Sequence, residues 1–157
     1  MIVQVKLNLL NNKVSLKIKA NIFILAHDLL FEIENRYMKN LIIVGHPYKK
    51  SFCYNGIFRT IFNEINKSGQ DLEVIDLYRD SFSRPRTKLI EKYKNLVVWS
   101  ERIYIISPVW WFRLTPRMEV FFDEVLTPGF AYKFVNLTKT YAYPKPFLKD
   151  KKVRTYI

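Results

Sequence analysis

The sequence has a single cysteine, Cys53, only four glycines, and 14 acidic residues against 26 lysines and arginines. One cysteine excludes an intramolecular disulfide framework, and four glycines exclude a collagen-like repeat. The same lone cysteine mildly favours a reducing compartment, which we take to be the cytoplasm. No stretch approaches the ~18 consecutive apolar residues that a membrane-spanning helix needs, so we expect no transmembrane segment.

The residues that are abundant predict a folded domain with a basic surface. Hydrophobic residues make up 49% of the 157 positions, which at this length suits one domain with a real core. The net charge of +12 would attract phosphates, anionic lipids and nucleic acid without sequence specificity. Because the basic residues are spread along the chain, a solvated lysine-rich surface is the favoured interpretation.

The first 37 residues differ from the rest, and Met38 marks the division. Apolar and polar residues alternate before position 20, and a helical pattern follows. Three interpretations compete: a signal peptide, an added hairpin and helix, or a translation start assigned too early. We favour the third, because the segment has the composition that A/T-rich codons would produce. The predicted organisation is an N-terminal extension over 1–37 and one domain over 38–157.

From Met38 onward, strand and helix patterns alternate. The apolar runs 41–44, 72–77 and 103–106 predict strands, and 153–157 predicts the start of a fourth. Between them lie helical patterns, the first capped by Ser51 and ending near Gly69. This order implies parallel βαβ units with right-handed crossovers. Ligands in such sheets bind beyond the carboxyl ends of the strands, which directs attention to the loops 46–53 and 107–115.

The two loops have different chemistry. The first loop contains His46, Lys50 and Ser51 and leads into a helix N-terminus, which favours an anion such as a phosphate. A capped helix without a ligand is equally compatible with that pattern. The second loop contains Trp110 and Trp111 next to Phe112, whose rings cannot all enter the core because neighbouring side chains diverge. It can form a platform for a flat ring system or a packing surface. Neither loop presents a second histidine, and we predict no metal site.

Together these segments resemble the NAD(P)H:quinone oxidoreductase family of flavodoxin-like flavoproteins. The matching residues are His46-Pro47 with Ser51-Phe52, Asp76-Leu77-Tyr78, Pro108-Val109-Trp110-Trp111-Phe112, Asp123 with Val125, and Pro128-Gly129-Phe130-Ala131-Tyr132. The resemblance runs from Met38 to the final residue. It implies an α/β flavodoxin-like three-layer sandwich with a parallel sheet.

The resemblance also implies a flavin site, with FAD or FMN as cofactor and NAD(P)H as co-substrate. It assigns the phosphate and nucleotide portion of the cofactor to His46, Lys50, Ser51, Phe52 and Cys53. It assigns the isoalloxazine ring to Pro108, Val109, Trp110, Trp111 and Phe112. Tyr132 and Phe134 correspond to aromatics of the substrate pocket, which in the family is completed across a homodimer. The expected reaction transfers a hydride from NAD(P)H through flavin to a quinone, and no protein side chain needs a catalytic role.

The largest departure from the family is at the end of the chain. After the fourth strand the family has a further flavin-wrapping loop, a fifth strand and the last helices, and the sequence stops at Ile157. We therefore expect an incomplete sheet, weak flavin binding and low activity. The alternative is a non-catalytic remnant or docking subunit of the same fold. A basic nucleic-acid-binding module is a third class, disfavoured by the βαβ order and by the lack of a recognisable motif.

Overall fold

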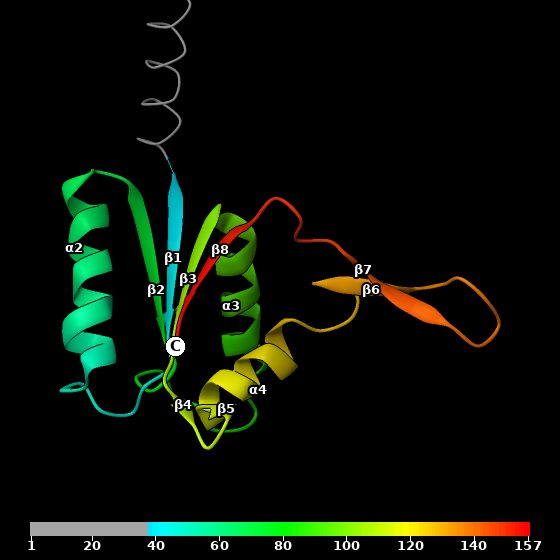
Figure 1. Ribbon diagram of the computed structural model, residues 1–157, viewed down its shortest axis with the longest axis horizontal. Helices are drawn as coiled ribbons and strands as arrows, with labels where there is room; N and C mark the ends of the chain where they lie inside the picture. The colour runs from blue at the N-terminus through cyan, green and yellow to red at the C-terminus, as the bar shows by residue number, and fades with distance from the viewer. Residues whose placement is uncertain (1–37) are drawn as a thin grey trace, which may run out of the picture. The chain divides into compact units, whose positions relative to one another are not determined.

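The computed structural model describes residues 38–157, so the predictions made for residues 1–37 lie outside the described residues. A parallel four-stranded sheet runs through the described part (Figure 1). Its order is β2 (Asp71–Asp76), β1 (Lys39–Val44), β3 (Arg102–Ile106) and β8 (Lys152–Tyr156). All three pairings are parallel. The four strands predicted from the sequence are thus confirmed, with β1 inside the sheet.

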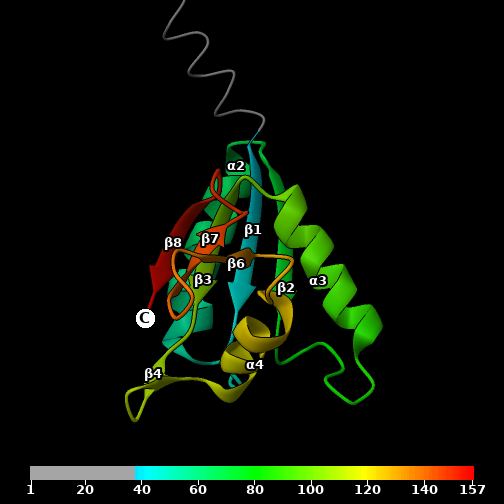
Figure 2. The ribbon, with the colours of Figure 1, turned by 90° about the vertical axis from the view of Figure 1, so that its right-hand side faces the viewer.

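Helices cover both faces of this sheet. The π-helix η1 (Cys53–Phe58) continues into α2 (Arg59–Lys67) on one face, and α3 (Thr87–Trp99) and α4 (Pro116–Val125) lie on the other (Figures 1 and 2). This three-layer arrangement is the predicted flavodoxin-like α/β fold. It arises because the strands of a parallel sheet need apolar cover on both sides.

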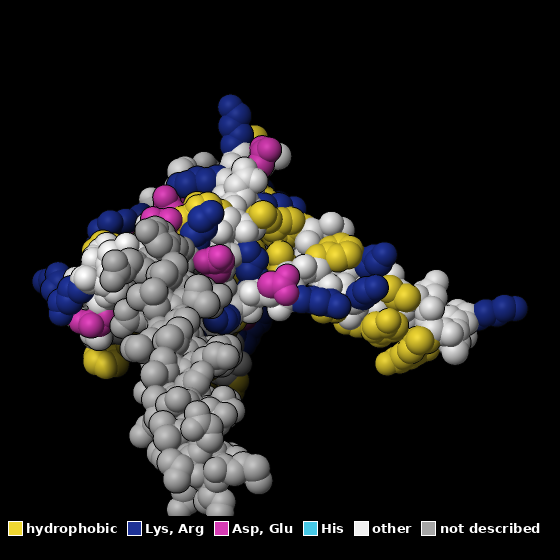
Figure 3. Space-filling model, turned by 90° about the horizontal axis from the view of Figure 1, so that it is seen from above, with side chains coloured by type: hydrophobic (Ala, Val, Ile, Leu, Met, Phe, Trp, Pro, Cys, Tyr) yellow, Lys and Arg dark blue, Asp and Glu magenta, His cyan; other side chains and the backbone are white. Residues whose placement is uncertain are grey.

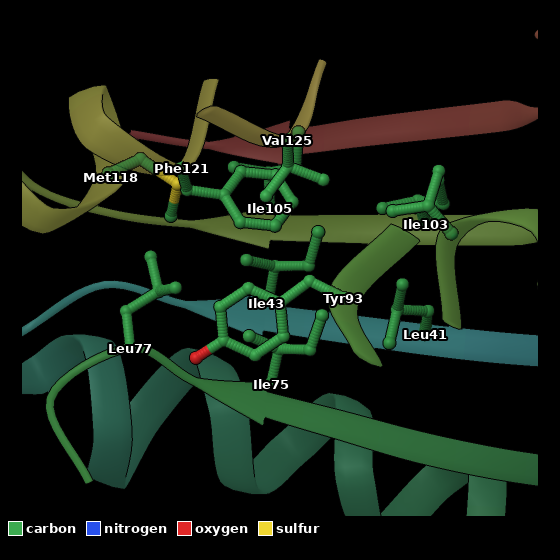
Figure 4. Close-up of a cluster of buried hydrophobic side chains, with 11 residues drawn as sticks. Leu41, Ile43, Ile75, Leu77, Tyr93, Ile103, Ile105, Met118, Phe121 and Val125 are labelled. Carbon is green, nitrogen blue, oxygen red and sulfur yellow. The ribbon is translucent and has the colours of Figure 1, made fainter. Parts of the chain in front are cut away.

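Alternate side chains of the strands form two cores. On the α3 and α4 side, a cluster forms around fully buried Leu41 and Ile43 of β1 (Figure 4). Its other buried members are Ile75, Leu77, Tyr93, Val97, Ile103, Ile105, Met118, Phe121 and Val125. On the η1 and α2 side, Ile42 and Val44 pack with Tyr54, Ile65, Tyr104 and Ile106. The strand period of two therefore decides which residue enters which layer.

Local signals in the sequence account for the helix ends. Gly69 follows the C-terminus of α2 with a φ of +68°, and its N–H donates to Asn66 O at 3.1 Å. This left-handed position favours glycine, which has no Cβ to collide with the backbone. Pro116 opens α4, where its missing N–H costs no hydrogen bond.

Two antiparallel hairpins were not predicted from the sequence. A short one joins β4 (Val109–Trp110) to β5 (Arg113–Leu114), directly after β3. A longer one joins β6 (Tyr132–Asn136) to β7 (Ala142–Pro146) and projects away from the sheet (Figure 1). Among residues 38–157, no helix is long and apolar enough to cross a membrane.

Candidate functional site

The site lies where the order of strands reverses. The chain passes from β1 to its neighbour β2 and then returns to β3 on the other side of β1. The loops that follow β1 and β3 therefore leave the same edge of the sheet in different directions. This is the switch point at which open parallel sheets bind ligands.

Buried hydrogen bonds hold the two loops together. Thr115 Oγ1 donates to Gly45 O at 2.8 Å, and Ser107 Oγ lies 3.5 Å from the same carbonyl. Thr115 and Ser107 are fully or almost fully buried. Glycine favours this approach, since a Cβ at position 45 would lie 3.2 Å from Thr115 Oγ1 and 3.3 Å from Met118 Cβ. The end of β1 is thereby fixed against the start of α4.

His46 links the first loop to the second. Its ring lies edge-on to Trp110, with centroids 5.7 Å apart and planes at 79°. The imidazole is only 7% exposed, and its Nδ1 accepts a hydrogen bond from the Tyr48 N–H at 3.0 Å. Desolvation by burial lowers the pKa of His46 below its ordinary value of 6.5. The ring is therefore neutral at neutral pH, and Nε2 carries the proton and can donate it in a hydrogen bond.

The β4–β5 turn has an unusual backbone. Val109 pairs with Leu114 and Trp110 with Arg113, so Trp111 and Phe112 alone form the turn. Their φ angles are +52° and +63°, in the left-handed region that a type I′ turn requires. Asparagine and glycine normally occupy these two positions. For larger residues the left-handed conformation costs roughly 1–2 kcal/mol each.

The two turn side chains are almost entirely exposed. Trp111 is 92% exposed and Phe112 is 99% exposed. The hairpin is nevertheless held in place, because Arg113 forms two hydrogen bonds with the Glu119 carboxylate of α4 at 2.9 and 3.0 Å. Strained, exposed aromatic residues on an anchored turn contribute nothing to the core, and such strain is typical of binding sites.

The first loop presents donors at the start of a helix. Among residues 38–157, the backbone N–H groups of Lys50, Phe52 and Cys53 donate to no described acceptor. Ser51 Oγ accepts from the Tyr54 N–H at 3.4 Å, as a cap would. The exposed Phe52 ring lies on Gly56, where a Cβ would approach it to 2.5 Å. These N–H groups and the helix dipole suit a phosphate.

Cys53 does not have the character of a nucleophile. Desolvation by burial raises the pKa of its thiol, so the thiol remains protonated at neutral pH. In the described part of the chain, no group of three or more His, Cys, Asp or Glu side chains is placed to hold a metal ion. The functional groups gathered here are therefore aromatic rings, N–H donors and one neutral imidazole.

The predicted site residues fall into two sets. His46 and Trp110 are in contact, and the rest of both loops, including Pro108 and Val109, lies at the same sheet edge. Tyr132 and Phe134 lie instead on β6, where their rings form an edge-on pair 5.4 Å apart. No described ring contact joins that pair to either loop.

Two residues that shape the site were missed by the sequence analysis. The sequence places Thr115 at the end of a loop, yet its buried hydroxyl joins β1 to α4. Arg117 lies over the rings of Tyr78 and Phe82 and donates to Leu77 O at 2.7 Å, which fixes the loop after β2. Neither has a local sequence signal, because the partners are about 40 to 70 positions away along the chain.

A family model described as "Flavodoxin-like fold" matches residues 38–157. The chain belongs to the flavodoxin-like fold family. The resemblance to NAD(P)H:quinone oxidoreductases seen in the sequence is thereby confirmed at the level of the family. YrkL of Bacillus subtilis, named an uncharacterized NAD(P)H oxidoreductase, is 33% identical over 96 residues that cover 60% of this chain and 51% of YrkL. The chain spans about half the length of the curated relatives it matches.

Solved structures of flavodoxin-like proteins share the fold. An NAD(P)H:quinone oxidoreductase from Methanothermobacter marburgensis superposes with a TM-score of 0.53 at 24% identity, over 62% of this chain and 57% of that protein. An FMN-dependent NADH-azoreductase from Bacillus anthracis, solved with FMN, superposes with a TM-score of 0.54 at 18% identity. The superposition covers 75% of this chain and 68% of that protein. At these identities the likeness concerns the fold alone.

Proposed function

We propose that this chain acts as a flavin-dependent NAD(P)H:quinone oxidoreductase, with FAD or FMN held by the loops after β1 and β3. The names of the relatives and structural neighbours support the reaction class, since they include NAD(P)H oxidoreductases, a quinone oxidoreductase and an FMN-dependent azoreductase. The geometry of this chain supports the location of the cofactor at the switch point of the sheet.

One observation carries the proposal: the strained turn Trp111–Phe112. Two bulky residues occupy left-handed positions and leave their rings in solvent, at the sheet edge where the family's ligands bind. A fold gains nothing from this arrangement. The binding of a planar cofactor would benefit from it, because apolar ring faces and nearby backbone groups can cover an isoalloxazine.

Each loop residue receives a role from its position. The backbone N–H groups of Lys50, Phe52 and Cys53, together with the Lys50 ammonium and the Ser51 hydroxyl, would hold the cofactor phosphate. Pro108, Val109 and Trp110 would lie along the ring system with the turn. The neutral His46 imidazole would donate from Nε2 and would keep Trp110 in place.

The reaction needs no protein nucleophile. A bound flavin supplies the hydride acceptor and donor between NAD(P)H and the quinone. The side chains of this chain orient the rings and exclude water from the ring face. Under this proposal Tyr132 and Phe134 are substrate-pocket residues, brought over a flavin by a second copy in a cytoplasmic homodimer.

Replacement of the strained turn by the residues it normally contains tests the proposal. In the double variant Trp111→Asn, Phe112→Gly, the type I′ turn loses its strain. We expect the free energy of unfolding in urea to rise by about 1–2 kcal/mol, which is less than the full cost of two strained residues because glycine loses more backbone entropy on folding. Titration with FMN and FAD, followed by flavin fluorescence, is expected to show affinity at least about ten-fold weaker, because two stacking rings are lost.

The control is Val98→Ala, which removes an exposed apolar side chain from α3, away from both loops. It should leave flavin affinity and flavin-stimulated NAD(P)H oxidation with a quinone unchanged. Equal flavin affinity in the turn variant and the native chain would contradict the proposal that Trp111 and Phe112 cover the flavin ring. Absence of flavin binding in the native chain would favour the alternative, a non-catalytic docking subunit of the same fold.

A further inference from the structure

A cavity of about 290 Å³ lies on the α3 and α4 side of the sheet, beside the edge strand β8. Ile103 and Ile105 of β3 line it from the sheet, and Leu126 lines it from the end of α4 (Figure 4). Val153 of β8 also lines it and is 53% exposed, so the cavity reaches the surface. Hydrophobic side chains are exposed beside the base of the β6–β7 hairpin (Figure 3). The described lining includes no residue from the loops of the proposed flavin site.

The cavity is large and apolar for the interior of a small domain. Folded proteins contain few voids larger than a water molecule. An engineered apolar cavity of roughly 150 Å³ stays dry and binds benzene, and ligand pockets begin at about 300 Å³. Apart from Lys151, the described side chains that line this cavity are all hydrophobic. Water would find no hydrogen-bond partners along most of the lining, so a hydrocarbon is the favoured occupant.

Lys151 supplies the charged group of the lining. Its ammonium donates to Val98 O at 2.6 Å and to Ser100 O, at the C-terminus of α3. An ammonium has three N–H donors, and in the described part of the chain no ion pair includes Lys151. Burial lowers the pKa of Lys151, because desolvation disfavours the charged form, while Glu101 and Asp150 act in the opposite direction. A ligand carboxylate beside the ammonium would stabilise its charge.

The chain around Lys151 is basic. From Lys149 to Arg154 there are four lysines and arginines and one acidic residue, Asp150. This end of the cavity therefore favours an anion. A sugar or a compact quinone has several oxygen atoms, and the apolar lining would leave them without partners at a cost in free energy. The lining suits a hydrocarbon chain with a single anionic end.

We propose that this cavity binds a medium-chain fatty acid. The carboxylate would accept a hydrogen bond from Lys151 Nζ, and the chain would lie against Ile103, Ile105 and Leu126. A second copy is disfavoured as the occupant, because two basic surfaces would meet. A peptide segment is disfavoured as well, because its backbone N–H and C=O groups would enter the apolar lining.

Calorimetric titration of the full chain tests this assignment. The two probes are decanoate and decan-1-ol, which have chains of equal length, at concentrations where neither forms micelles. Decanoate is expected to bind at least about ten-fold more tightly than decan-1-ol, because only the carboxylate can pair with the Lys151 ammonium.

Two lysine variants of the same segment separate a specific contact from general attraction. Lys151→Met keeps an unbranched apolar side chain in the lining, so it should weaken decanoate binding by about ten-fold and leave decan-1-ol binding unchanged. Lys149→Met is the matched control, since it removes the same charge from an exposed position outside the lining. It should change the affinity for decanoate by less than about two-fold, because solvent screens that charge.

A third variant, Leu126→Trp, places a larger side chain in the cavity. It should weaken both probes by at least about ten-fold. Circular dichroism reports whether each variant keeps the fold, and the lysine variants decide the outcome if Leu126→Trp does not fold. None of these measurements depends on flavin binding.

Preference for decanoate that Lys151→Met abolishes and Lys149→Met keeps supports the assignment. Equal affinities for decanoate and decan-1-ol in the native chain would overturn it, as would equal losses in the two lysine variants. Binding of neither probe would also overturn it. A concentration-dependent dimer that Leu126→Trp dissociates, in a chain that binds neither probe, would identify a second copy as the occupant.

Discussion

At the scale of single residues, the site depends on close approaches that only small or hydroxylated residues allow. Gly45 at the end of β1 lets Thr115 and Met118 of the α4 region come within contact distance. The Gly45 carbonyl then receives its hydrogen bond from the Thr115 hydroxyl at 2.8 Å. A buried carbonyl that loses its donor costs about 1–3 kcal/mol. Thr115 therefore stabilises both the fold and the geometry of the two loops.

Thr115→Val is expected to lower the free energy of unfolding by about 1–3 kcal/mol, because it keeps the shape but removes the hydroxyl donor. Urea unfolding followed by circular dichroism measures the change. Thr60→Val is the matched control. The Thr60 hydroxyl donates to Gly56 O within the exposed surface of a helix, where water can replace it. Comparable losses in the two variants would contradict the role given to the buried hydroxyl.

At the scale of elements, an ion pair fixes α3 against α4. The Arg86 guanidinium, just before α3, donates to both carboxylate oxygens of Glu124 near the end of α4. The carboxylate also lies 3.7 Å from Arg84. The hydrogen bonds from Arg86 hold the pKa of Glu124 below its ordinary value, against the opposing effect of burial. The loop before α3 and the α4 helix are thus held together by charge as well as by the apolar core.

The Arg86–Glu124 pair makes the free energy of unfolding fall as the pH is lowered. The pKa of Glu124 is lower in the folded state than in the unfolded state. The ionised carboxylate therefore stabilises the fold at a pH above its unfolded-state pKa. This stabilisation is lost as the pH falls through its folded-state pKa. Glu124→Gln should therefore lower the free energy of unfolding at about pH 7 and match the native chain at about pH 2. Urea unfolding at a series of pH values measures the difference.

Glu91→Gln on the exposed surface of α3 serves as the control for that series. In the ion pairs described among residues 38–157, Glu91 has no partner, so its substitution should change stability little at either pH. If Glu124→Gln lowered the free energy of unfolding by the same amount at every pH, the Glu124 side chain would act by packing alone.

At the scale of the whole molecule, Met38–Ile157 forms one compact unit. The family match covers the same residues, 38–157. Both apolar clusters are built from strands and helices of this unit. We propose that this unit is the flavin-binding domain and that residues 1–37 are an extension to it.

A chain that begins at Met38 is expected to fold with a thermal midpoint within about 4 °C of the full chain, since a loss of ~1 kcal/mol shifts the midpoint by a few degrees in a domain of this size. Its flavin affinity should also be unchanged. Thermal unfolding by circular dichroism and flavin titration make the comparison. Failure of the shortened chain to express in folded form would show that the first 37 residues are structural.

The sequence by itself determined the elements whose signals are local. Apolar runs predicted the four strands of the sheet, and the glycine after α2 predicted its end. The order of strands and helices predicted parallel pairing and hence the edge at which ligands bind. These features follow from apolar runs, from the 3.6-residue period of the helices and from glycine at a helix end, which are signals that each segment carries without help from the rest of the chain.

Only the tertiary structure decided the hairpins and the contacts between loops. Trp111–Phe112 violates the usual composition of a two-residue turn, and Pro144 and Pro146 are residues that normally argue against a strand. The ring contact of His46 with Trp110 joins residues far apart in the chain. Tertiary contacts override local preference here, because the sheet brings the loop ends together and the hydrogen bonds from Arg113 to Glu119 of α4 hold the turn in its strained conformation.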